Sequence, residues 1–240
     1  MVSRRHPDSA DAAHSTREPA KAKGATNAKG RGATQRQGLR GGRTQVKERV
    51  VLAAQKLFAE RGYRGVTVRE IGAAAGVSHA LVHRYFGGKH DVLVAVFRHN
   101  AMPMVATAQS AATARGTAVA MMRALRTDRR DYLKLVTRLA LDGTPVESVG
   151  HDFPALRLFI RLLERESDAE AVRAGDLPDP RVLAAAATAF VYGWAAVEDW
   201  LLPLVGLAKS DRERIEASLD LALGAMIEGG LSPRAGHEGR

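Results

Sequence analysis

The sequence predicts an all-α protein in which a small helix-turn-helix unit precedes a larger helical body. From Thr44 onward, apolar residues recur every three or four positions, which is the period of an amphipathic helix. Residues 104–230 show none of the strict apolar–polar alternation that is typical of a half-buried strand. Gly and Pro residues divide this region into segments of helical length, so we expect a series of helices.

The composition indicates a folded protein without cysteine chemistry. Apolar residues make up 45% of the 240 residues, which is enough for a sizeable core. The absence of Cys excludes disulfide bonds and thiolate metal sites. Basic residues near the N-terminus are not followed by the apolar stretch of a secretory signal, so we expect a cytoplasmic protein.

The net charge of +10 is distributed unevenly along the chain. Residues 1–43 hold ten Lys/Arg and three Asp/Glu, and residues 44–90 hold eight and three, giving +7 and +5. Residues 91–240 hold eighteen and twenty, giving −2. The basic charge therefore predicts a polyanion partner for the N-terminal part of the chain.

Residues 1–43 are predicted to form a disordered basic tail. This stretch is rich in Gly, Ala, Ser, Thr, Gln and basic residues, and it has too few large apolar side chains to offset the entropy of ordering. Two interpretations remain open. The tail is either an arm that contacts DNA phosphates or a groove, or a solubilising leader.

The stretch from Thr67 to Phe86 is predicted to be a helix-turn-helix. Thr67 and Glu70 have the spacing of a capping box, which starts the first helix. Gly76 suits a chain reversal, and Ser78 is a good N-cap for a second helix that extends to Phe86. An amphipathic helix from Thr44 to Arg61 precedes the pair and supplies the apolar face that two short helices need. Such a unit is typical of proteins that read DNA.

About 50 residues of this region resemble the DNA-binding domain of the TetR family of bacterial transcription regulators. The matching elements are Ala53-Ala54 with Leu57-Phe58, Gly62-Tyr63, Thr67-Val68-Arg69-Glu70-Ile71, Gly76-Val77-Ser78, and Tyr85-Phe86 with Lys89. Ala80 and His83 depart from the family's usual Gly and Tyr. The resemblance implies a three-helix helix-turn-helix DNA-binding domain, followed by a helical ligand-binding and dimerisation domain.

The second helix of the motif is expected to lie in the major groove of double-stranded DNA. His79, Leu81 and His83 are placed to reach base edges, where Leu81 offers apolar contact. The residues placed to hold phosphates are Thr67, Ser78, Arg84, Tyr85 and Lys89.

We expect a DNA-binding domain over residues 44–104, a helical ligand-sensing and dimerisation domain over 105–230, and a flexible C-terminus over 231–240. Pro103 predicts that the connecting helix ends or bends near residues 101–104. Helices of the body are expected near residues 104–113, 117–126, 129–141, 153–174, 180–203 and 210–229.

The run from Val182 to Val197 contains no charged residue. It is shorter than the roughly 20 residues of a bilayer span and is closed by Glu198-Asp199, so we expect no membrane partner. Its apolar character all round predicts a helix buried on all sides. The resemblance implies that the helices near 180–203 and 210–229 form the interface of a homodimer as a four-helix bundle.

The resemblance also implies a cavity in the body for an unidentified small molecule. Candidate lining residues are Met121, Tyr132, Phe159, Tyr192, Trp194 and Glu198. Packing in the core is the alternative use of each apolar side chain among them. Glu198 and Asp199 would be costly to bury unpaired, which suggests a position at the mouth of the cavity and a preference for a cationic or hydrogen-bonding ligand.

We find no motif for catalysis, cofactor or metal binding, and we expect that the protein is not an enzyme. No nucleophile elbow, zinc-protease motif or phosphate-binding loop is present. His79 and His83 have a spacing that suits a metal, but no third ligand accompanies them.

Together these observations predict a homodimeric transcriptional regulator, most often a repressor in this family, that binds a palindromic operator and is released by a small molecule. The alternative is an architectural, nucleoid-type DNA-binding protein that uses its basic tail and has no inducer.

Overall fold

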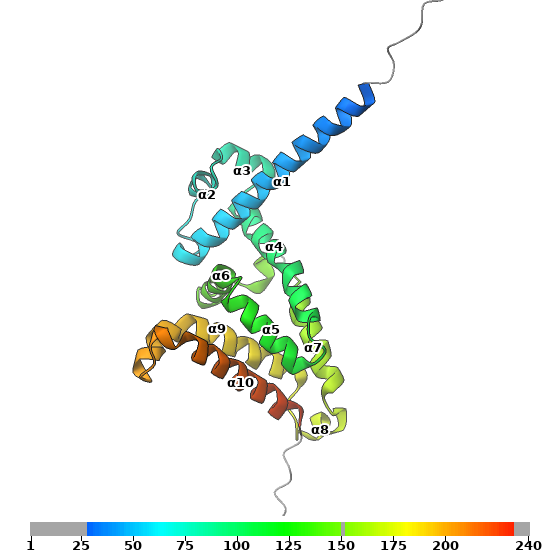
Figure 1. The fold of residues 1–240 in the computed structure, drawn as a ribbon, viewed down its shortest axis with the longest axis vertical. Helices are drawn as coiled ribbons and strands as arrows, with labels where there is room; N and C mark the ends of the chain where they lie inside the picture. The colour runs from blue at the N-terminus through cyan, green and yellow to red at the C-terminus, as the bar shows by residue number, and fades with distance from the viewer. Residues whose placement is uncertain (1–27, 150–151, 233–240) are drawn as a thin grey trace, which may run out of the picture. The chain divides into compact units, whose positions relative to one another are not determined.

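A computed structural model describes residues 28–149 and 152–232 of the chain (Figure 1). The chain divides into two compact units, residues 1–42 and 43–240, and the sites discussed below lie in the second unit. Across the described residues, ten α-helices and two 3-10 turns form the regular structure, and no strand occurs. The predicted all-α fold is confirmed.

The first helix, α1, spans Ala28–Arg61 and begins sixteen residues before the expected start at Thr44. The prediction of a disordered tail is therefore wrong for residues 28–43, while residues 1–27 lie outside the described part of the chain. Extension of a formed helix adds one hydrogen bond per residue without a new nucleation step. The packed part of α1 therefore allows the helix to continue into a segment that has no apolar face.

Helices α2 (Val68–Ala75) and α3 (His79–Phe86) follow α1 and coincide with the predicted motif. We call residues 43–88 the head. Its core holds the fully buried side chains of Phe58, Ile71 and Val82, one from each helix. Burial of one large side chain per helix stabilises each by about 2 kcal/mol, which two short helices could not gain alone.

Helix α4 spans Lys89–Gln109 and passes through Pro103 without ending. The expected end of the helix near residues 101–104 is therefore wrong, while the alternative of a bend there stays a prediction. A domain boundary at residue 104 falls inside a helix. Pro103 removes one backbone donor, a loss on the order of 3 kcal/mol. Met104 and Ala108 are buried, and their packing holds the helix together beyond the proline.

The body comprises the helices from α5 onward. They are α5 (Ala114–Arg126), α6 (Arg130–Leu141), α7 (Pro154–Glu166), α8 (Ala169–Ala174), α9 (Pro180–Leu204) and α10 (Arg212–Leu231), with 3-10 turns at Val146–Val149 and Lys209–Asp211. Helix α5 contacts α4, α6, α7, α9 and α10 and so forms the centre of the body (Figure 1). The expected single segment near 153–174 is two helices, because Asp168 caps α8 through its side chain.

Helix α9 is long and apolar enough to cross a membrane by length and composition alone, with 22% of its most apolar window buried. It packs against α6, α7 and α10. The prediction of burial on all sides is wrong for the single chain, since the side chains of Val182, Trp200 and Leu204 are 61%, 69% and 65% exposed. An exposed apolar face on a long helix is typical of a surface that a partner covers.

Candidate nucleic-acid interface and ligand cavity

The start of α2 is held by the predicted capping box. The backbone N–H of Glu70 donates to Thr67 Oγ1 at 3.3 Å, and the backbone N–H of Thr67 donates to Glu70 Oε2 at 2.8 Å. The Thr67 hydroxyl donates to the same carboxylate oxygen at 2.7 Å, so its proton points to Glu70 in this arrangement. Hydrogen bonds from Thr67 and then from Arg61 lower the pKa of Glu70 to about 2.

Two glycines set the angle between α2 and α3. Gly76 ends α2 with a φ of +66°, in the left-handed region that favours glycine. At Gly72, a Cβ atom would lie 2.9 Å from the carbonyl oxygen of Val77. A glycine inside a short predicted helix is the signal in the sequence that corresponds to this close approach.

Helix α3 presents the predicted recognition residues on its outer face. Ser78 caps it by accepting from the backbone N–H of Leu81 at 3.3 Å, and Val82 anchors it in the core. Of the candidate DNA-contacting residues, those that are exposed are Thr67, Ser78, His79, His83 and Arg84, and those that are half-buried are Leu81, Tyr85 and Lys89.

His83 is held by the end of its own helix. Its Nδ1 lies 2.7 Å from the carbonyl oxygen of Gly87. A carbonyl oxygen can only accept, so this contact requires the ring proton on Nδ1 and leaves Nε2 as an acceptor when the imidazole is neutral.

Cations from α1 and α4 lie over aromatic rings of the head. Arg43 lies 5.4 Å from the ring centre of Tyr85, and Lys47 lies 5.7 Å from that of Phe86. Lys89 lies 4.5 Å from the ring centre of Tyr63 and donates to its carbonyl oxygen at 3.0 Å. Because an ammonium has three donors, Lys89 keeps protons for a phosphate beside this contact.

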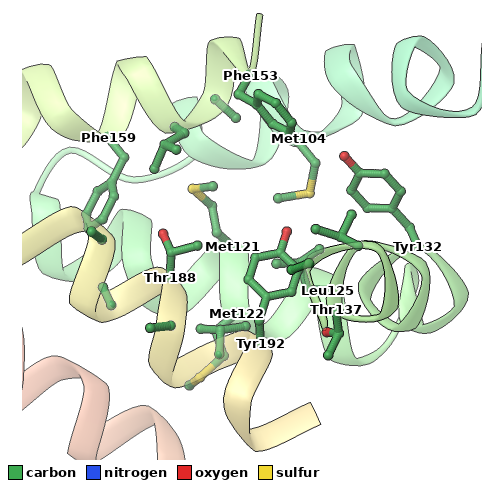
Figure 2. Close-up of a pocket in the computed structure, with 18 of the residues that line it drawn as sticks. Met104, Met121, Met122, Leu125, Tyr132, Thr137, Phe153, Phe159, Thr188 and Tyr192 are labelled. Atoms are coloured by element: carbon green, nitrogen blue, oxygen red, sulfur yellow. The ribbon is translucent and has the colours of Figure 1, made fainter. Parts of the chain in front are cut away.

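A partly open cavity of about 620 Å³ lies between α4 and the body, within the usual size range for small-molecule sites. Figure 2 shows side chains from several helices converging on it. Four of the predicted lining residues do line it, namely Met121, Tyr132, Phe159 and Tyr192. Further lining residues that the sequence analysis missed include Asn100, Met104, Phe153 and Thr188.

Trp194 and Glu198 are the exceptions, and their predicted place at the cavity is wrong. Both lie in a separate pocket between α6, α9 and α10. Trp194 Nε1 donates to Glu198 Oε2 at 3.0 Å, and Arg130 binds the other carboxylate oxygen at 2.7 Å. The carboxylate is thus paired within the protein, and the argument that it favours a cationic ligand at the cavity does not hold.

Asn100 links the cavity to the head. Its side chain is 1% exposed and lines the cavity from α4. Its Nδ2 donates to Gln55 Oε1 on α1 at 2.7 Å, and its Oδ1 accepts from Arg129, just before α6, at 3.2 Å. One amide therefore joins the cavity wall, the head and the body. A buried Asn in an apolar helix was the available sequence signal.

A second contact joins α6 to the end of α1. Arg138 Nη1 donates to the carbonyl oxygen of Glu60 at 3.2 Å. A Cβ at Gly62 would lie 3.1 Å from Arg138 Nε. Helices α4 and α6 therefore each hold α1 by a hydrogen bond, α4 at Gln55 and α6 at Glu60.

Within the part of the chain that the structure describes, no group of three or more His, Asp or Glu side chains is arranged to hold a metal. The His83 Nδ1 contact described above occupies one nitrogen of the His79–His83 pair.

Comparison with known proteins agrees with this arrangement. A family model described as "Bacterial regulatory proteins, tetR family" matches residues 50–96. The HTH-type transcriptional repressor Rv3405c of Mycobacterium tuberculosis is 29% identical over 198 residues, covering 82% of this chain and 97% of that protein. These matches support assignment to the TetR family. The chain is also 49% identical over 47 residues to the regulator BetI of Brucella anthropi, which covers 20% of the chain and 24% of BetI.

Solved structures share the fold of this chain. The fatty acid degradation regulator FadR from Bacillus halodurans matches with a TM-score of 0.54 and 19% identity, covering 78% of this chain and 97% of FadR. GusR from Salmonella enterica matches with a TM-score of 0.54 and 18% identity, covering 78% and 95%. The family model and the repressor relative, rather than these structures, support a DNA-binding transcriptional regulator with its helix-turn-helix in the matched region.

Proposed function

We propose that this TetR-family regulator is a cytoplasmic homodimeric repressor that binds a palindromic operator and leaves it when a small molecule fills the cavity of the body. The observation that carries the proposal is the position of Asn100. Its side chain lines the cavity and is hydrogen-bonded to α1 of the head. A molecule in the cavity therefore touches the residue that connects it to the DNA-binding unit.

Dimerisation is supported by the apolar faces of α9 and α10. Val182, Trp200 and Leu204 on α9 and Leu221 on α10 are each more than half exposed in the single chain. Pairing these faces across a two-fold axis would build a four-helix bundle and remove them from water. A two-fold axis would also repeat α3, so the operator would have half-sites about 34–36 Å apart.

In the proposed complex, α3 enters the major groove through its exposed face. His79 and His83 would read base edges, and Leu81 would contact a thymine methyl group. Ser78, Arg84, Tyr85 and Lys89 would hold phosphates, with Lys89 at the N-terminus of α4. Thr67 would act mainly through its capping box, because its hydroxyl proton is donated to Glu70.

Release would follow from a change at α4. The cavity and the Gln55 contact both depend on the part of α4 around Asn100, so a bound molecule that displaces this segment changes the support of α1. Such a molecule weakens operator binding only by the amount that it prefers the displaced arrangement, and by reciprocity the operator weakens binding of the molecule equally.

In vitro selection from random duplex DNA, followed by footprinting, tests the proposal. We expect one short palindrome, protected on two adjacent turns of the same face, and a dimer in solution. Continuous coating of long DNA without a selected sequence would instead support an architectural DNA-binding protein.

A further inference from the structure

Two phenol groups in the cavity bear on the chemistry of the proposed effector, and this inference rests on the proposed function. Tyr132 on α6 is 5% exposed, and Tyr192 on α9 is half-buried. Both side chains reach into the cavity with their hydroxyl ends (Figure 2). Within the described part of the chain, neither hydroxyl has a hydrogen-bond partner. A hydroxyl that faces a cavity without a partner in the protein can donate to a bound molecule, so a molecule that accepts from it gains affinity.

The remaining polar side chains of the cavity are already bonded. Thr137 donates to the carbonyl oxygen of Leu133 at 2.9 Å, and Thr188 donates to that of Ala184 at 2.8 Å. Asn100 donates to Gln55, as described above, and to the carbonyl oxygen of Val96 at 2.8 Å. Among the described residues that line the cavity, the phenols of Tyr132 and Tyr192 are thus the side-chain donors that remain for a bound molecule.

The described residues that line the cavity offer no charge to pair with a charged molecule. None of them is an Asp, Glu, Lys, Arg or His. Burial raises the pKa of Tyr192 to about 12 and raises that of Tyr132 further, with a smaller contribution from Tyr192. Both phenols therefore stay protonated at neutral pH and can donate. A carboxylate or an ammonium would lose its hydration without an ion pair in return.

The apolar part of the cavity suits an aromatic molecule. Phe153 and Phe159 line it together with Met104 and Met121, and Figure 2 shows these side chains around the same space as the phenols. Thioethers adapt to irregular shapes and make favourable contacts with aromatic rings. Aromatic rings also prefer edge and offset contacts of the kind that these phenylalanines can supply.

We propose that the cavity binds a neutral, largely apolar aromatic molecule whose acceptor oxygen, such as that of a ketone or an ester, receives hydrogen bonds from Tyr132 and Tyr192. The aromatic part lies among the Met and Phe side chains. The acceptor end lies between α6 and α9.

Four probes that share one ring system test this proposal on the full-length protein without DNA. They are 2-acetonaphthone, which is neutral and accepts, 2-ethylnaphthalene, which does not accept, and the charged 2-naphthoate and 2-naphthylmethylammonium. Titration calorimetry measures each dissociation constant. We expect 2-acetonaphthone to bind at least about tenfold more tightly than either charged probe.

Conservative variants assign the effect to the phenols. Tyr132→Phe and Tyr192→Phe should each weaken the binding of 2-acetonaphthone by about three- to tenfold. The affinity for 2-ethylnaphthalene should stay unchanged. Tyr63→Phe, which removes a phenol of the head outside the cavity, is the matched control and should bind all four probes as the parent does. Thermal melting and binding to the selected operator confirm that each variant is folded.

Three results would overturn the proposal. The first is tighter binding of a charged probe than of 2-acetonaphthone, and the second is no binding of 2-acetonaphthone up to about 1 mM. The third is an equal loss of affinity for 2-ethylnaphthalene in the Phe variants, which would mean that the phenols contribute by packing and not by donating a hydrogen bond. A separate titration of the operator complex keeps the proposed function distinct. If 2-acetonaphthone binds as expected but does not release the operator, the proposed release by a small molecule is wrong, while the proposed class of ligand is supported.

Discussion

The head and the body use their polar side chains in different ways. In the head, polar groups bond over short sequence distances, as Thr67 does with Glu70 and Ser78 does with Leu81. In the body, some polar groups join distant segments, as Glu198 does with Arg130, and others stay without a partner at the cavity, as Tyr132 does. The polar groups of the head are thus bonded to residues close to them in sequence, while the body keeps hydrogen-bond donors that another molecule can use.

The largest effect should come from breaking the proposed dimer face of the body. Trp200→Glu places a charge on the exposed apolar face of α9 and should give a monomer. A monomer holds one head per operator, so affinity for the palindrome should fall by about a hundredfold or more. Light scattering and a binding titration measure the two effects.

Met102→Glu is the matched control, because Met102 is equally exposed, at 69%, but lies on α4. It should remain a dimer with unchanged operator affinity. A dimeric Trp200→Glu protein would contradict the assignment of the α9 face.

The second-largest effect should come from filling the close approach between Gly72 and the backbone of Val77 in the head. Gly72→Ala brings a Cβ within 2.9 Å of the Val77 carbonyl oxygen, and we expect a loss of about 2 kcal/mol in the free energy of unfolding, measured by urea titration. Operator affinity should fall with it.

Gly42→Ala is the control, because no atom lies within 4 Å of its Cβ position in α1. There the protein should gain up to about 1 kcal/mol of stability, since alanine favours a helix interior. Equal losses at both glycines would refute the steric explanation.

A smaller effect should appear where the two regions meet. Gln55→Leu removes the head's partner of Asn100 without altering the cavity wall. The factor by which 2-acetonaphthone weakens operator binding should fall by about fivefold, which corresponds to a loss of about 1 kcal/mol in coupling free energy. The affinity of 2-acetonaphthone for the protein without DNA should stay the same. Lys56→Leu, a neighbouring exposed position on α1, should keep the full factor. An unchanged factor in Gln55→Leu would exclude this contact as the route between the regions.

The smallest effect concerns the capping box of the head and depends on pH. The folded pKa of Glu70 is about 2, below its ordinary value of 4.5, so its charge stabilises the folded state above pH 4.5. That stabilisation declines as the pH falls from 4.5 toward 2. Glu70→Gln should therefore be less stable than the parent at pH 7, and the gap should narrow on acidification below pH 4.5. Urea titrations at several pH values measure it, and a constant gap would contradict the charged capping box.

Local patterns allowed most of the head to be predicted from the sequence. The bounds of α2 and α3, the caps at Thr67 and Ser78 and the end at Gly76 agree with the structure, because each depends on contacts within a few residues. The start of α1 was wrong by sixteen residues, since helix extension costs little and leaves no mark in the pattern of apolar residues. The passage of α4 through Pro103 depended on burial beyond the proline, which composition does not show.

The sequence by itself determined the helical fold, the helix-turn-helix and the face that α3 turns outward, because helical period and capping are properties of neighbouring residues. The tertiary structure decided what the body holds. It brought Tyr132 and Tyr192 to one cavity, moved Glu198 away from it into a pair with Arg130, and placed Asn100 against Gln55, 45 residues away. These partners come from different helices, and the packing that brings helices together is not encoded in any one segment.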